Sequence, residues 1–118
     1  MIYDTNNIFA KIIRGEVAAK IVYEDANVLA IHDINPVAPI HVLIFPKGQY
    51  ISFEDFTNTA TGEEITDYFL KVSHVAKKLG IARDAYRIIT NIGLKSGQTI
   101  FHFHTHIISG KEMTKLIE

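Results

Sequence analysis

Three histidines alternate with other residues in the segment 101–108, at positions 102, 104 and 106. The segment is otherwise rich in residues that favour β-strands, and alternate side chains of a strand project from the same face. We therefore expect His102, His104 and His106 to share one face of a strand. Imidazoles titrate near neutral pH, transfer protons and can act as nucleophiles, so this face is the first candidate for chemistry.

Four interpretations of this pattern compete. The histidines could lie on the solvated face of a strand, although strict alternation argues against chance. Two of them could bind one zinc ion, but all three span about 13 Å of strand, so a further ligand such as His41 would be needed. In the third interpretation the central imidazole attacks phosphorus and its neighbours assist. In the fourth, the same pocket only binds a ligand.

The residues around the histidine segment favour a site that handles phosphate. Gly97, Gln98 and Thr99 lead into it and offer backbone N–H groups and a hydroxyl, which suit phosphate oxygens. Asn91 ends the preceding strand and His41 begins another, so both could lie close by. Each has a structural explanation when taken alone, as a turn residue, a cap or a structural histidine. Together they indicate an oxyanion or phosphate site.

The composition limits the classes of protein to consider. A chain of 118 residues is long enough for one domain, spanning 1–118. The net charge of −1 leaves no electrostatic footprint for nucleic acid or a membrane surface. No apolar run is long enough to span a membrane, and the N-terminus does not resemble a signal peptide. Cysteine is absent, which excludes disulfides and thiolate chemistry. We expect a cytoplasmic protein without nucleic-acid or membrane partners.

Apolar periodicity and turn residues predict the elements that position these side chains. The expected elements are a helix at residues 7–13, strands at 19–24, 28–32 and 41–45, a helix at 62–79, and strands at 85–90 and 99–108. Two prolines make residues 35–39 a loop. Residues 91–98 join the last two strands as a hairpin loop. The expected fold class is α+β, with a five-stranded, mostly antiparallel sheet, one short helix, and one long helix on a face of the sheet.

The long helix carries the clearest signals. Thr61 and Glu64 form a capping-box pattern at its start, and Gly80 is placed to end it. Apolar residues at 4-3-4-3 spacing predict one buried stripe, which consists of Ile65, Phe69, Val72, Ala76 and Leu79. His74 lies off this stripe, and we expect it and His32 on the surface.

The chain resembles a known family at several places. Residues 102–108 resemble the His-φ-His-φ-His-φ-φ signature, where φ is apolar, of the histidine triad (HIT) superfamily of nucleotide hydrolases and transferases. Thr105 departs from it, since the family usually has an apolar residue there. Residues 8–16 resemble the opening of the nucleoside phosphoramidase branch, the histidine triad nucleotide-binding proteins. Residues 32–41 resemble the ribose loop and auxiliary histidine of that branch, and 91–108 its hairpin and triad.

This resemblance implies roles for four histidines. His104 would be the nucleophile that attacks the α-phosphorus and forms a nucleotidyl-histidine intermediate. His106 would contact the phosphate and assist protonation of the departing group. His102 would hold the pocket through hydrogen bonds, with His41 behind it setting its tautomer and orientation.

The resemblance also implies the binding residues. Asn91 and the backbone of Gly97 and Gln98 would hold phosphate oxygens. The Thr99 hydroxyl would serve a phosphate oxygen or the leaving group. Asp33 would accept from the ribose hydroxyls, with Ile34 flanking the sugar. The purine slot would be lined by Ile8, Phe9, Ile12, Val17 and Ile31.

The implied function is that of a purine nucleotide-binding hydrolase. It would cleave the P–N bond of adenosine 5′-phosphoramidates, such as AMP-NH2 or AMP-lysine, without a metal or other cofactor. His106 favours hydrolysis, because transferases of the superfamily commonly have Gln there. Members of the branch are homodimers, so the sheet would extend across a two-fold axis. A dinucleoside polyphosphate hydrolase and a non-catalytic nucleotide- or partner-binding module are the alternatives. The chain lacks the Trp-Pro-Pro-Gly-like ending of some relatives, which leaves the leaving-group preference open.

Overall fold

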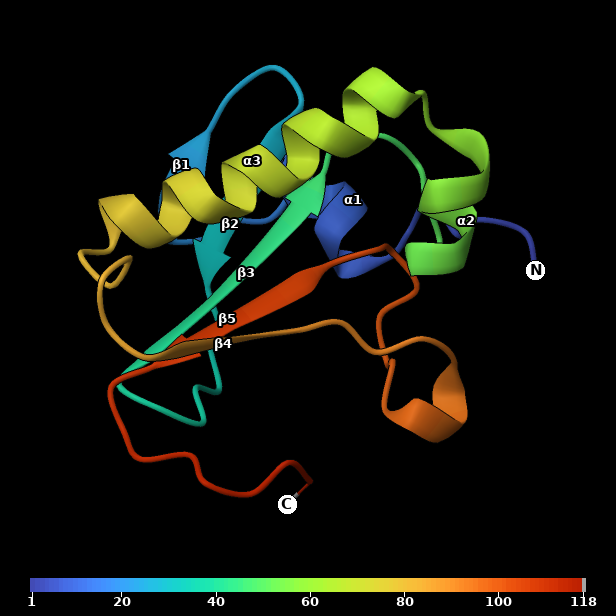
Figure 1. Ribbon diagram of the computed structural model, residues 1–118. Helices are drawn as coiled ribbons and strands as arrows, with labels where there is room; N and C mark the ends of the chain where they lie inside the picture. The colour runs from blue at the N-terminus through green and yellow to red at the C-terminus, as the bar shows by residue number, and fades with distance from the viewer. Residues whose placement is uncertain (118) are drawn as a thin grey trace.

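Five strands form one antiparallel sheet in the computed structural model, which describes residues 1–117 (Figure 1). The strands, in the order β1-β2-β3-β5-β4, are β1 (Ile21–Glu24), β2 (Val28–His32), β3 (Ile40–Pro46), β5 (Thr105–Ser109) and β4 (Tyr86–Ile89). The helices are α1 (Ile8–Ile13), α2 (Phe53–Thr59), α3 (Gly62–Lys78) and the 3-10 turn η1 (Leu94–Ser96). Every pairing between neighbouring strands is antiparallel. The predicted α+β fold class is confirmed.

Both faces of the central strand β3 are covered. Towards α3, Val42 and Ile44 belong to one apolar cluster with the buried side chains of that helix. On the opposite face, Leu43 and Phe45 belong to a second cluster with Phe9 of α1. The rings of Phe9 and Phe45 stack with centroids 4.4 Å apart. Because each fully buried apolar side chain contributes about 1.5–3 kcal/mol, these two clusters hold α1 and α3 on opposite faces of the sheet.

Helix α3 begins and ends as the sequence predicts. The Thr61 hydroxyl accepts from the Glu64 N–H, and Gly80 follows the last turn with a φ of 77°. The buried face is rotated relative to the predicted stripe, because Phe69 is 40% exposed while Tyr68 is 1% exposed. Burial of Tyr68 is possible because its hydroxyl donates to a carbonyl of β3, which satisfies the polar group inside the core.

The predicted strand at residues 99–108 is wrong over its first half, because β5 begins only at Thr105. The ladder to β3 cannot continue past this point, since Pro46 has no N–H to donate. The chain before β5 bonds to a loop instead, and the Phe103 N–H donates to the Tyr50 carbonyl at 2.7 Å. The other predicted elements agree with the structure to within two residues.

Helix α2 has no counterpart among the predicted elements. Ser52 caps its start by accepting from the Asp55 N–H, and Phe56 is its one buried residue. A single apolar anchor in seven residues leaves no periodic stripe to recognise, so only the Ser-x-x-Asp cap signals this helix in the sequence.

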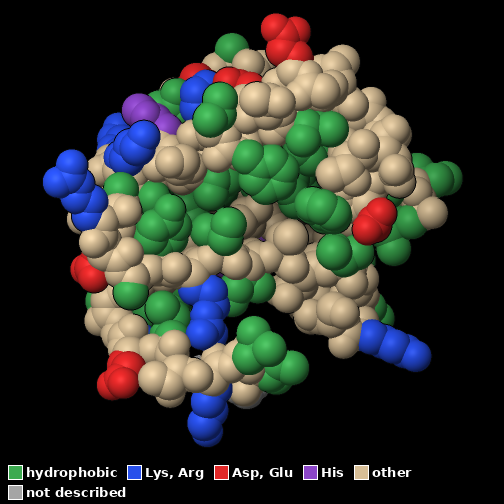
Figure 2. Space-filling view, in the orientation of Figure 1, with side chains coloured by type: hydrophobic (Ala, Val, Ile, Leu, Met, Phe, Trp, Pro, Cys, Tyr) green, Lys and Arg blue, Asp and Glu red, His purple; other side chains and the backbone are tan. Residues whose placement is uncertain are grey.

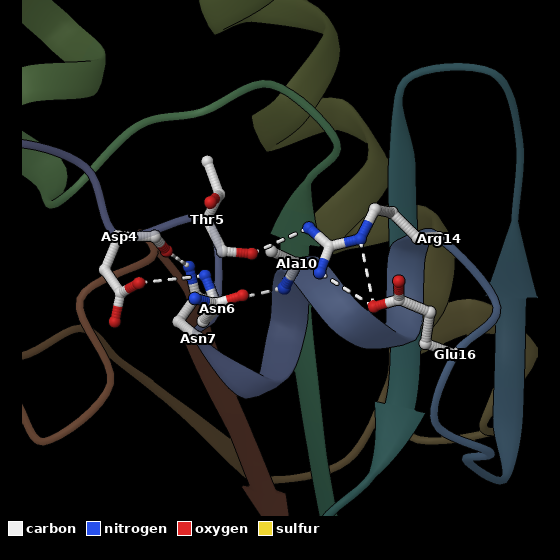
Figure 3. Close-up of polar contacts among 7 residues, drawn as sticks. All are labelled: Asp4, Thr5, Asn6, Asn7, Ala10, Arg14 and Glu16. Atoms are coloured by element: carbon white, nitrogen blue, oxygen red, sulfur yellow. Dashed lines mark hydrogen bonds and ion pairs between the residues drawn. The ribbon is translucent and has the colours of Figure 1, made fainter.

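The N-terminal segment is fastened to α1 by polar contacts (Figure 3). The Asn7 side chain accepts from the Ala10 N–H and caps the helix. Arg14 donates to the Thr5 carbonyl at 2.7 Å and pairs with Glu16 at 2.8 Å. These contacts fix the path of the residues that precede the helix.

The apolar surface of the molecule is uneven. Hydrophobic side chains gather over α3 and the strands beneath it (Figure 2). Exposed members on these elements are Phe69 and Leu70 of α3 and Ile88 of the edge strand β4. None of the helices within residues 1–117 is long and apolar enough to cross a membrane.

Candidate active site

The predicted histidine cluster exists, although only part of it lies in a strand. His106 is in β5, opposite Leu43 of β3, and therefore lies on the sheet face that carries α1. His102 and His104 precede β5, and the ring centroids of His104 and His106 are 5.2 Å apart. The structure thus brings the second and third histidines side by side.

His104 is a neutral imidazole with a free basic nitrogen. Its Nδ1 lies 2.7 Å from the His102 carbonyl, which can only accept, so Nδ1 carries the proton. No hydrogen bond within residues 1–117 engages Nε2. Burial lowers the pKa of His104, which keeps the ring neutral at pH 7. These are the properties of a nitrogen nucleophile.

His106 presents an N–H donor at Nε2, because a chain of hydrogen bonds that begins at the backbone fixes its tautomer. The Val37 N–H donates to Nδ1 of His41, so His41 carries its proton on Nε2. That nitrogen lies 2.9 Å from Nδ1 of His106 and 3.3 Å from Oδ2 of Asp33. His106 accepts at Nδ1 and therefore carries its own proton at Nε2. Burial, and then the neighbouring His104 and His41, lower the pKa of His106 to about 4.

The structure corrects the implied place of His41. The resemblance puts it behind His102, whereas its ring contacts His106. The register explains this, because His41 pairs with Ile108 across the ladder between β3 and β5, two residues beyond His106. His41 thus orients the third histidine and not the first.

His102 is a structural member of the cluster. It is fully buried among the rings of Phe9 and Phe45. Its Nε2 donates to the Pro46 carbonyl at 2.7 Å, so Nδ1 accepts from the Tyr3 hydroxyl. Burial lowers the pKa of His102 to about 4. Sequence reasoning missed Tyr3, since nothing in the sequence connects residues 99 positions apart.

The loop before the histidines is held by the Gln98 side chain. Its Oε1 accepts from the Gly93 N–H at 3.0 Å, and its Nε2 donates to the Ile51 carbonyl at 2.7 Å. Gly97 has a φ of 93°, a conformation that side chains other than glycine rarely adopt. Thr99 is exposed. Gln98 therefore shapes the loop with its side chain, leaving its backbone as the part that could meet phosphate.

Two cavities share His41 as a lining residue. One, of about 720 Å³, is bordered by Asn91 and His106, and the other, of about 750 Å³, by Asp33 and Ile34. His41 borders both. Of His102, His104 and His106, only His106 borders either of these cavities. His32 is exposed, as expected, at the rim of the second cavity, and His74 is exposed on α3.

The five residues predicted for the purine slot border neither cavity. Phe9 and Ile31 belong to the apolar cluster around α1, with Ile12 packed against it. Ile8 is exposed, and Val17 is half-buried at the end of the turn that follows α1. Their packing supports α1, and a base-binding role for them stays a prediction.

The sequence alone allows a metal site at the histidines. Oxygen or nitrogen atoms of Asp33, His41 and His106 all lie within 4.8 Å of one another. The nitrogens of the two histidines share a hydrogen bond at 2.9 Å, whereas two ligands of a tetrahedral zinc ion lie about 3.3 Å apart. A hydrogen bond therefore links the two histidine side chains. A metal ion could bind between the two histidines only if the hydrogen bond that joins them broke.

Comparisons with known proteins agree on one family. The HIT domain matches residues 14–113. An uncharacterized HIT-like protein from Rickettsia prowazekii is 49% identical over 115 residues, which cover 98% of this chain and 96% of that protein. A HIT family hydrolase from Clostridium thermocellum superposes with a TM-score of 0.87 at 43% identity, covering 96% of this chain and 97% of that one. A histidine triad nucleotide-binding protein from Candida albicans gives a TM-score of 0.81 at 28% identity, covering 91% and 76%.

Proposed function

This chain belongs to the HIT domain family, and we propose that it hydrolyses the P–N bond of adenosine 5′-phosphoramidates without a metal ion. Its fold is that of HIT family hydrolases. The observation that carries the proposal is the pairing of a free Nε2 on neutral His104 with an N–H donor on the adjacent His106. The first can attack phosphorus while the second assists the departing nitrogen.

The proposed reaction has two displacements at phosphorus. In the first, a bond forms between Nε2 of His104 and the α-phosphorus, and the P–N bond of the substrate breaks. The leaving nitrogen accepts a hydrogen bond from the Nε2–H of His106, takes up one proton from solvent and departs as the amine. In the second, water attacks the phosphorus, the bond to His104 breaks, and the water releases one proton. The net reaction consumes one water and yields AMP and an amine.

The two cavities support an assignment of the substrate's halves. Asp33 and Ile34 border one of them, so we place the ribose there, where a carboxylate can accept from its hydroxyls. Asn91 borders the other beside His106, where an amide can donate to a phosphate oxygen. The leaving group then extends into the cavity on the His106 side.

AMP release from adenosine 5′-phosphoramidate, measured with a chelator present, tests the proposal. We expect turnover by the wild type and a loss of at least about 10³-fold in the His104→Ala variant, since the nucleophile is removed. AMP binding by calorimetry should persist in that variant, because Asp33 and the apolar clusters remain. Turnover that disappears with chelator would contradict the metal-free mechanism. If the protein cleaves only diadenosine polyphosphates, these compounds replace phosphoramidates as the substrate class. Tight AMP binding without any turnover would indicate a nucleotide-binding module.

We further propose that two copies of the chain pair through β4. This strand is an edge of the sheet, and its Ile88 is 50% exposed. Unpaired strand edges readily pair with another chain. The apolar side chains over α3 and the neighbouring strands lie on the same side of the sheet as Ile88, which pairs with the core residue Ile107 (Figure 2). A two-fold pairing would cover them and extend the sheet.

A further inference from the structure

The nucleophile of the proposed reaction lies just outside the regular part of the sheet. The register pairs between β5 and β3 stop at Thr105. Those between β5 and β4 stop at His106. His104 precedes both limits, so strand pairing does not reach the residue that must be aimed at phosphorus. Side-chain hydroxyls hold the backbone at this point instead.

A threonine next to β4 holds the backbone of His104. Thr90 directly follows Ile89, the last residue of β4, and its Oγ1 donates to the His104 carbonyl at 2.8 Å. Thr90 is half-buried, so water competes only in part for this hydrogen bond. The carbonyl of the peptide between His104 and Thr105 is thereby tied to the end of β4.

A second hydroxyl holds Thr105 from the opposite face of the sheet. Thr105 pairs with Ile44, which belongs to the apolar cluster beneath α3, so its side chain points away from the histidines. Its Oγ1 lies 2.7 Å from the hydroxyl of Tyr68, on the helix that lies across this face (Figure 1). Tyr68 gives its one proton to the Ile44 carbonyl at 2.9 Å and therefore accepts from Thr105. This chain of hydrogen bonds ties the first residue of β5 to α3 and β3.

We propose that Thr90 and Thr105 are positioning residues that aim His104 at phosphorus, with Tyr68 as the fixed point for Thr105. One hydroxyl holds the carbonyl of the peptide that follows His104, and the other holds the residue after that peptide. The inference rests on the proposed function, because it concerns the aim of the nucleophile in that reaction. A nucleophile displaced by about 1 Å can lose on the order of 10²-fold in rate, so a small shift of this backbone is enough to slow the reaction.

Packing gives no reason for a hydroxyl at Thr105. The residue is 3% exposed beside an apolar cluster, where valine would have the same shape. It is also the position at which the histidine segment departs from the family signature, which usually has an apolar residue there. A buried pair of hydroxyls adds little to stability compared with apolar groups of the same shape. The Thr105 hydroxyl therefore supplies a direction that a methyl group would not.

Two substitutions of Thr105 separate its hydroxyl from its shape. Thr105→Val keeps the shape and loses the hydroxyl, while Thr105→Ser keeps the hydroxyl and loses the methyl group. Both variants should fold, because Tyr68 still donates to the Ile44 carbonyl and no buried donor is left unpaired. The measurement is AMP release from adenosine 5′-phosphoramidate. We expect kcat to fall by about tenfold in Thr105→Val with KM changed by less than about twofold, and Thr105→Ser to keep the wild-type kcat.

The same pair of substitutions at Thr90 should give the same pattern, since Thr90→Val removes the donor to the His104 carbonyl. The matched control is Ser109→Ala. It removes a buried hydroxyl from the other end of β5, where Ser109 donates to the Ala85 carbonyl at 2.7 Å, and should keep the wild-type kcat. Wild-type kcat in either valine variant overturns the inference. So does a serine variant as slow as its valine counterpart, or an equal loss in Ser109→Ala.

A measurement without substrate separates this inference from the proposed function. The Nδ1 proton of His104 is hydrogen-bonded to the His102 carbonyl, so its exchange with water, followed by NMR, reports how firmly the ring is held. We expect exchange to be at least about threefold faster in the two valine variants and unchanged in the serine variants and Ser109→Ala. Unchanged exchange in the valine variants overturns the positioning role. A wild type that does not hydrolyse the phosphoramidate overturns the proposed function instead, while the exchange rates still decide whether the two threonines hold His104.

Discussion

Backbone groups set the tautomer of three histidines in this site. The carbonyls of His102 and Pro46 fix the protons of His104 and His102, and the Val37 N–H fixes that of His41. Backbone groups do not titrate, so these assignments hold across the working pH range. The residue types and their alternation could be read from the sequence. The partner of each ring nitrogen could not, because it depends on carbonyls brought near by the fold.

The lowered pKa values predict an unusual pH profile for the reaction. Burial holds His106 at a pKa of about 4 and lowers that of His104. The nucleophile His104 reacts above its pKa, so the activity should persist to a lower pH than an ordinary histidine allows. An ordinary histidine with a pKa near 6.5 would be about thirtyfold less deprotonated at pH 5. The measurement is the initial rate of AMP release against pH, corrected for spontaneous hydrolysis. A midpoint near pH 6.5 would mean that burial does not lower the pKa of the reacting histidine.

Tyr3 is predicted to position the cluster through His102. Removing its hydroxyl in Tyr3→Phe leaves Nδ1 of the buried His102 without its donor, which should destabilise the fold by about 1 kcal/mol. Because the His102 carbonyl holds His104, kcat should fall by about three- to tenfold with little change in KM. Nitrogen NMR of the His102 ring would report any change in its tautomer.

The control for this variant is Tyr50→Phe, which removes a hydroxyl that donates to Glu64, away from the histidines. We expect wild-type kcat and an unchanged His102 spectrum. Equal effects of both substitutions on kcat would mean that Tyr3 acts only through general stability.

At the scale of elements, the sequence predicts the helices and strands that carry the site better than the contacts between the site residues. Periodicity and caps locate α3 and all five strands, because those signals are local. The sequence predicts too early a start for β5, because the limit of this strand is set by Pro46 on another strand. The contact of His41 with His106 likewise depends on the register between β3 and β5. Register between strands distant in the chain leaves no local trace in the residues themselves.

The loop that precedes the histidines depends on one glycine. Gly97 has a φ of 93°, and a Cβ added there would meet nothing within 4 Å, so the cost of Gly97→Ala comes from the backbone alone. We expect about 1–2 kcal/mol of destabilisation, measured by urea unfolding. Weaker AMP binding should accompany it, because the N–H groups of the loop would move. The matched substitution Gly62→Ala, in the first turn of α3 with equally open space, should be neutral or slightly stabilising. Equal costs at both positions would refute the strained turn.

At the scale of the whole molecule, the two edges of the sheet differ. β1 and β4 are both edge strands, and each carries one exposed isoleucine, Ile21 at 53% and Ile88 at 50%. Only Ile88 borders the side where apolar side chains gather over α3 (Figure 2). Ile21 and Ile88 are similarly exposed but have different surroundings. Substituting each of them therefore tests which edge of the sheet forms an interface.

Ile88→Glu should convert the proposed dimer to a monomer, while Ile21→Glu should leave it a dimer. A charge placed at each edge repels a second copy of the same strand, but this matters only where the strands meet. Light scattering coupled to size-exclusion chromatography gives the mass of each variant, and circular dichroism checks that both are folded. A wild type of single-chain mass would contradict the dimer, and dissociation by Ile21→Glu alone would move the interface to β1. If Ile88→Glu is monomeric and still hydrolyses adenosine 5′-phosphoramidate, each chain holds a complete site, as expected from histidines that all lie within one protomer.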